Sequence, residues 1–97
     1  MLESLALGTF APRIGDRFRL STSEGAAIDA TLIEATPIGA SALGRRQPFS
    51  IVFLGPLSPV WAQRIYRVEH EALGSCDLFL VPIGPRDGGM QYQAIFT

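Results

Sequence analysis

The chain has 97 residues, which gives room for one hydrophobic core and predicts a single domain over residues 1–97. Charged residues make up only 18% of the sequence and apolar residues 47%, whereas an average soluble domain is about 25% charged, so part of the apolar surface is expected to face a partner. The net charge of −1, with no cationic run longer than Arg45-Arg46, excludes the basic footprint of nucleic-acid-binding proteins.

The cellular location is inferred from the segments that the sequence lacks. Cys76 is the only cysteine, so no internal disulfide can form. Glu3 stands where a secretory signal would carry Lys or Arg, and no apolar stretch approaches the roughly 20 residues of a membrane helix. We therefore expect a soluble product of the cytoplasm that binds no membrane and that could still leave the cell as part of an assembly.

Alternating apolar and polar residues predict the first two strands. Residues 17–22 alternate strictly and place Phe18 and Leu20 on one face. Turn residues at 23–25 and a second alternating segment over 28–33 complete a predicted hairpin.

The middle of the chain predicts a loop, a strand and a short turn. Residues 36–48 are rich in Gly, Ala, Ser and Pro, which is typical of a loop. The β-branched and aromatic run 49–54 is closed by Gly55-Pro56 and has the composition of a strand buried on both sides. Ser58-Pro59 could begin at most one turn of helix.

The last third of the chain predicts three more strands. Residues 64–70 and 90–96 alternate, while residues 77–83 form a second run that is apolar on both faces. Pro82 cannot donate a ladder hydrogen bond and is expected at an edge, a bulge or a strand end, and residues 84–89 form a dense turn signal. Together the segments predict an all-β fold, a six- to seven-stranded antiparallel barrel or sandwich, and a barrel of this size is normally filled by its own side chains.

No residue pattern predicts a catalytic, cofactor or metal site. His70 is the only histidine, and a lone histidine at a strand end is usually structural. Cys76 follows it at a spacing that does not match a zinc site. Ser50 or Ser75 could be combined on paper with His70 and Asp77 into a triad, but neither serine lies in a Gly-x-Ser-x-Gly setting. We therefore expect a protein that is not an enzyme and binds no cofactor.

The two apolar runs, residues 49–54 and 77–83, tell more about function than the candidate catalytic residues do. A filled barrel needs apolar side chains on one face of each strand only. A neighbouring subunit, or the N-terminal segment with its leucines and Phe10, must cover the other face. Trp61 could serve as an exposed anchor or cover a barrel end, and the arginine pair could contact an acidic partner. The predicted interface residues are Val52, Leu54, Trp61, Phe79, Val81, Arg45 and Arg46.

Several segments together resemble a small bacterial domain family of unknown function. They are residues 48–56, 63–66, 69–70, 73–74, 78–85 and 92–96, and more loosely 15–20. The resemblance implies a small β domain encoded beside phage-tail-collar-type proteins, and it carries over no catalytic residue.

The sequence therefore leaves two functions open. The first is a non-enzymatic structural or adaptor protein of a phage-tail-like or fibre-like assembly, which contacts copies of itself or a tail-collar-type fibre protein through its β surface or through an unpaired strand edge. The alternative is a small ligand- or glycan-binding barrel that uses Trp61, Tyr66, Tyr92 and the Arg45-Arg46 loop around one mouth.

Overall fold

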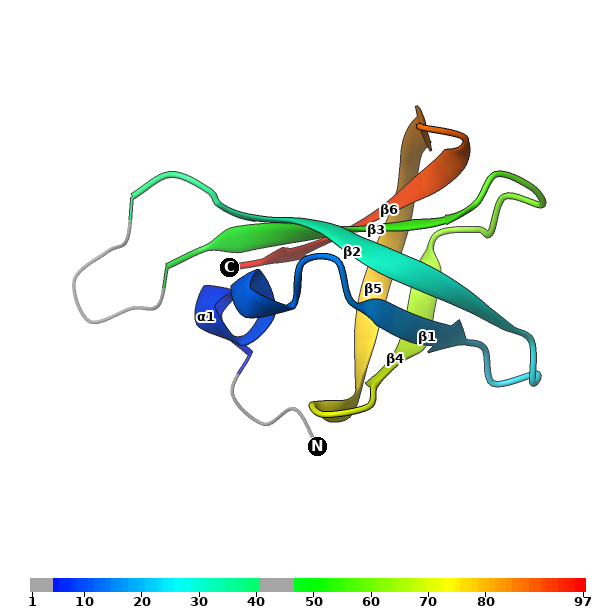
Figure 1. Cartoon of the computed structure of the whole chain (residues 1–97), viewed down its shortest axis with the longest axis horizontal. Coiled ribbons are helices and arrows are strands. Elements are labelled where there is room, and N and C mark those ends of the chain that lie inside the picture. The colour runs from blue at the N-terminus through cyan, green and yellow to red at the C-terminus, as the bar shows by residue number, and fades with distance from the viewer. Residues whose placement is uncertain (1–4, 41–46) are drawn as a thin grey trace.

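The computed structural model describes residues 5–40 and 47–97, and it is a closed antiparallel barrel in the order β1-β2-β3-β6-β5-β4 (Figure 1). This confirms the all-β prediction and decides for the barrel over the sandwich. The strands are β1 Arg17–Ser21, β2 Ala27–Pro37, β3 Phe49–Pro56, β4 Arg64–His70, β5 Gly74–Arg86 and β6 Gly89–Phe96. They follow α1 Leu7–Phe10 and the 3₁₀ turn η1 Ala11–Arg13.

The barrel interior is filled by the side chains that the alternation predicted. Each strand presents every second residue inward, because successive side chains of a strand point to opposite faces. The buried interior positions include Phe18, Leu20, Ala30, Leu32, Ile51, Phe53, Tyr66, Val68, Leu78, Leu80, Met90, Tyr92, Ala94 and Phe96. In β2 the register shifts between Leu32 and Glu34, and the extra residue at this bulge is Ile33, whose place on the polar side the simple alternation does not explain.

The N-terminal segment covers one end of the barrel. Phe10 is fully buried and packs against Phe49 at the start of β3 and Phe96 at the end of β6, with ring centroids 6.1 and 5.7 Å away. Leu5 and Leu7 pack against the same core. The predicted membership of this segment in the fold is confirmed, but it covers an end of the barrel rather than the outer face of either apolar strand.

The β3–β4 connection crosses the opposite end, because β3 and β4 lie on opposite sides of the closed strand order. Residues 57–63 form an irregular loop with a cis Ser58–Pro59 bond, so the helical turn predicted there is wrong. The backbone of this loop bonds to the barrel instead of to itself: the Trp61 N–H donates to the Tyr92 hydroxyl at 2.8 Å. The helical turn of the fold lies in α1, where nothing in the alternation pointed to it.

Strand β5 changes partner half way along its length. It pairs with β4 from Gly74 to Leu80 and with β6 from Val81 onward. The register shifts between Pro82 and Gly84. Of the three placements expected for the proline, an edge, a bulge or a strand end, the structure therefore shows a bulge directly after it. Strands β5 and β6 are joined by a two-residue turn, Asp87-Gly88. Both residues have positive φ, as an Asp-Gly hairpin turn requires.

Candidate functional site

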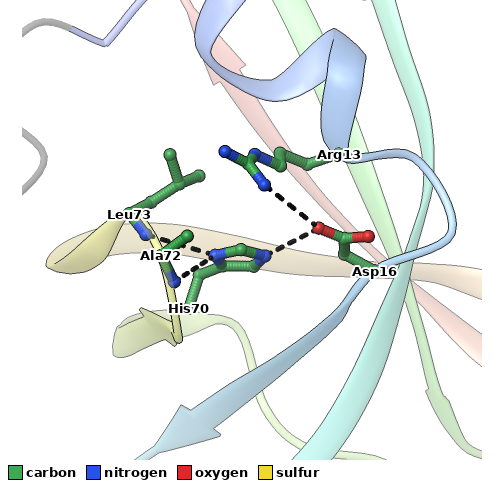
Figure 2. Close-up of polar contacts among 5 residues, drawn as sticks. All are labelled: Arg13, Asp16, His70, Ala72 and Leu73. Atoms are coloured by element: carbon green, nitrogen blue, oxygen red, sulfur yellow. Dashed lines mark hydrogen bonds and ion pairs between the residues drawn. The ribbon is translucent and has the colours of Figure 1, made fainter.

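His70 is held by hydrogen bonds at both ring nitrogens (Figure 2). Nε2 lies 2.8 Å from Oδ2 of Asp16, which Arg13 also approaches at 3.8 Å. Nδ1 accepts the backbone N–H groups of Ala72 and Leu73 at 3.0 and 3.2 Å. Since Nδ1 is an acceptor, the imidazole proton lies on Nε2, which donates to Asp16. Neither nitrogen is directed at a serine, and the arrangement ties the start of β1 to the β4–β5 turn.

The other residues weighed for catalysis have structural contacts. The Ser75 hydroxyl accepts a hydrogen bond from Arg67 at 3.3 Å, and Ser50 lies buried on β3. Burial, and secondarily the neighbouring Asp77 carboxylate, raises the pKa of the Cys76 thiol to about 11, so the thiol stays protonated near neutral pH. In the described ranges 5–40 and 47–97 no three His, Cys, Asp or Glu side chains are grouped as metal ligands.

The barrel mouth proposed for a ligand is occupied by the β3–β4 loop. Trp61 is half-buried and its ring stacks on Tyr66, with centroids 5.1 Å apart. The Tyr66 hydroxyl donates to the Ala62 carbonyl, and the Tyr92 hydroxyl accepts from the Trp61 backbone. Burial raises the pKa of Tyr66. These three aromatic residues therefore hold the loop over the barrel end, and Arg45 and Arg46 lie outside the described residues.

An apolar face covers the outside of β4, β5 and the end of β6. Ile65 is 61% exposed and lies opposite Phe79, which is 54% exposed, in the β4–β5 register. Ile95 on β6 is 59% exposed, and Val81 is half-buried next to Phe79 on the same face of β5. We call Ile65, Phe79, Val81 and Ile95 the apolar face.

A hollow of about 240 Å³ divides this face. It opens where β5 and β6 separate, because the two strands pair only on the hairpin side of Val81 and Gln93. Phe79 and Ile95 line its two sides. The hollow is thus an apolar depression on one side of Phe79, and Ile65 projects from the surface on the other side.

Charges border the apolar face at the Arg67 and Asp77 positions, which are opposite each other in the β4–β5 register. Arg67 turns toward Ser75 and Glu69, its Nε lying 3.9 Å from the Glu69 carboxylate. Asp77 is exposed and forms no ion pair with any residue in the described part of the chain. On the far side of β4 the barrel surface is polar, with Arg19 between Asp29 and Glu69 in the register.

The structure keeps some of the predicted interface residues at the surface and buries others. Phe79 and Val81 lie in the apolar face. Val52, although it points outward between Glu34 and Gln93 in the register, is only 2% exposed. It is covered by its own chain rather than left for a partner.

Other side chains extend along the outside of the barrel near β3. The ion pair of Glu34 on β2 with Arg86 on β5, at 2.5 Å, spans the two strands between them, β3 and β6. Leu54 is half-buried and packs against Gly89, where an added Cβ would lie 2.9 Å from the Leu54 Cγ.

Ile65 and Ile95 were missed by the sequence reasoning. Both occupy outward positions in strands that otherwise alternate cleanly, and an isoleucine at a polar position of an amphipathic strand was the available signal.

Sequence comparison relates the chain to a protein family. A family model described as "Domain of unknown function (DUF6916)" matches residues 5–96. Comparisons with curated proteins and with solved structures found no match. Among the described residues no helix is long and apolar enough to cross a membrane. The match spans the whole barrel, so the chain belongs to the DUF6916 family of domains of unknown function.

Proposed function

We propose that this chain is a non-enzymatic structural or adaptor domain of a phage-tail-like or fibre-like assembly, and that it acts through protein–protein contacts on its outer β surface. The observation that carries the proposal is the apolar face. Three large apolar side chains, each more than half exposed, lie on neighbouring strands. Such a contiguous patch on a small domain marks an interaction site.

The arrangement of the barrel supports a binding role over a chemical one. Its interior is filled, its mouth is covered by the β3–β4 loop, and both nitrogens of its only histidine are engaged in structural hydrogen bonds. A closed barrel with a filled interior that exposes apolar side chains on one flank is suited to dock as a preformed unit, so binding would cost little conformational entropy.

Contact through the outer face of the barrel is favoured over strand addition. The part of β5 that lacks β4 as a neighbour, from Val81 to Arg86, contains Pro82 and Pro85. Proline has no backbone N–H, and prolines at exposed edges discourage pairing with another chain. The side chains of the apolar face are therefore the proposed contact.

The test is association of the purified chain with copies of itself or with a tail-collar-type fibre protein, measured by co-elution and calorimetry. Phe79→Glu should weaken binding by at least about tenfold, as expected for an aromatic residue at the centre of an interface. Ile14→Glu is the matched control, because Ile14 is 49% exposed but precedes β1, outside the apolar face. Equal affinity of the Phe79→Glu and wild-type chains, or a wild-type chain that binds neither a second copy nor the fibre protein, would contradict the proposal.

A further inference from the structure

We infer that the occupant of the apolar face is a second copy of this chain, bound about a two-fold axis that passes over Phe79. This inference rests on the proposed function and names its partner. In this arrangement Ile65 of each copy enters the hollow between β5 and β6 of the other. The same rotation brings Arg67 of each copy over the partner's Asp77.

Shape on the two sides of Phe79 supports the two-fold arrangement. Ile65 projects from β4 on one side of Phe79, and the hollow lies on the other side, between Phe79 and Ile95. A two-fold axis nearly parallel to β5 exchanges these two sides, so each projection meets a depression. An axis inclined by about 15° to β5 makes the facing strands cross at about 30°, which is the angle of aligned sheet packing.

Charge supports the same axis. With strands roughly 4.8 Å apart and residues rising roughly 3.3 Å along a strand, the inclined axis superposes the Arg67 position of one copy on the Asp77 position of the other. Within one chain these two residues are opposite in the register, yet Arg67 turns toward Ser75 and Glu69 and Asp77 has no ion-pair partner among residues 5–40 and 47–97. In the dimer, Arg67 of each copy faces Asp77 of the other, so both Asp77 carboxylates gain an ion-pair partner.

The exposed area fits a dimer of ordinary size. The three large side chains of the apolar face each expose more than half of roughly 200 Å², which amounts to roughly 350 Å². A standard interface buries about 800 Å² per partner, of which a little over half is apolar. The apolar face with Val81 and the stem of Arg67 therefore supplies most of the apolar part, and polar residues at its margin supply the rest.

The experiment measures molar mass by sedimentation equilibrium over a concentration series. The wild-type chain is expected to approach twice its 10.5 kDa. Arg67→Asp alone and Asp77→Arg alone each place like charges together at both contacts, and each should weaken the dimer by at least about tenfold. An equimolar mixture of the two variants restores opposite charges at both contacts and should dimerise like the wild type.

The mixture separates contact between copies from damage within one chain, since a defect inside a fold is not repaired by a second variant molecule. Arg19→Asp and Asp29→Arg are the matched controls, because this pair is also opposite in a register but lies on β1 and β2; both should keep the wild-type mass. Three results would each overturn the inference: a wild-type monomer at every concentration, a dimer unaffected by the single variants, or no recovery on mixing. If the inference fails while the fibre protein still binds through Phe79, the proposed function stands; if that binding fails as well, both are lost.

Discussion

The Nε2 atom of His70 lies 2.8 Å from Oδ2 of Asp16, across 54 positions of sequence. The pair joins the segment that leads from η1 into β1 to the end of β4, next to the short β1–β4 ladder that closes the barrel. The ring also lies 4.6 Å from that of Phe18 in the core. The histidine therefore contributes to barrel closure through its two nitrogens and its packing.

Substitution of His70 should separate its two hydrogen-bonding roles. His70→Ala should lower the free energy of unfolding by about 2–3 kcal/mol, because it leaves polar groups unpaired and removes a buried ring. His70→Asn should cost about 1 kcal/mol less than that, since its side-chain oxygen can accept the backbone N–H two residues on. Urea unfolding would measure both. Glu71→Ala, at an exposed neighbour, should stay within about 0.5 kcal/mol of the wild type, and equal losses for the alanine and asparagine variants would contradict the role of Nδ1.

The tautomer of His70 is a second expectation. Because Nδ1 accepts two backbone N–H groups, the neutral ring should carry its proton on Nε2. Long-range ¹H–¹⁵N correlation spectra at neutral pH distinguish the two tautomers by the ¹⁵N shifts of the ring. A proton on Nδ1 would show that the β4–β5 turn is not held as described.

Removal of the aromatic ring that covers one barrel end should destabilise the fold strongly. Phe10→Ala should lower the free energy of unfolding by about 3–4 kcal/mol, because Phe10 is fully buried against Phe49 and Phe96. Ile14→Ala, at an exposed position in the same segment, should cost less than about 1 kcal/mol. Similar small losses for both in denaturant unfolding would mean that the N-terminal segment does not belong to the core.

An introduced charge should affect the stability of the monomer very differently at two outward positions, Val52 and Phe79. Val52→Asp should prevent or severely weaken folding of the monomer, because the carboxylate would be buried without a partner at a position that is 2% exposed. Phe79→Asp should retain the wild-type circular dichroism. At dilutions at which both chains are monomers, it should unfold within about 1 kcal/mol of the wild type, because Phe79 is exposed in the monomer. Equal stability of the two variants would place Val52 at the surface instead.

Cys76 should react slowly with thiol reagents in the folded chain. Its pKa, raised by burial to about 11, leaves roughly one thiolate in a thousand at pH 8, and the thiolate is the reacting form. The alkylation rate should rise about tenfold per pH unit from pH 8 to 10, and unfolding in urea should increase it sharply. A rate at pH 8 equal to that of a free thiol would show that the side chain is accessible and its pKa unshifted.

The sequence by itself determined the strands and most of the interior. Alternation assigned Phe18, Leu20, Tyr66 and Val68 to one face, and a strand has only two faces, so the period of two is sufficient for that assignment. The missing N–H of Pro82 predicted an edge, a bulge or a strand end at that position, and the structure shows a bulge directly after it. These are local properties, set by each residue and its immediate neighbours.

Tertiary structure alone decided what covers each face. Val52 and Phe79 lie in equally apolar runs, yet the folded barrel leaves Val52 only 2% exposed and Phe79 54% exposed. The same holds for α1, whose four residues have no period of their own and are placed by Phe10 entering the barrel end. Coverage depends on contacts between distant segments, and closure of the barrel brings those segments together; no local pattern encodes them.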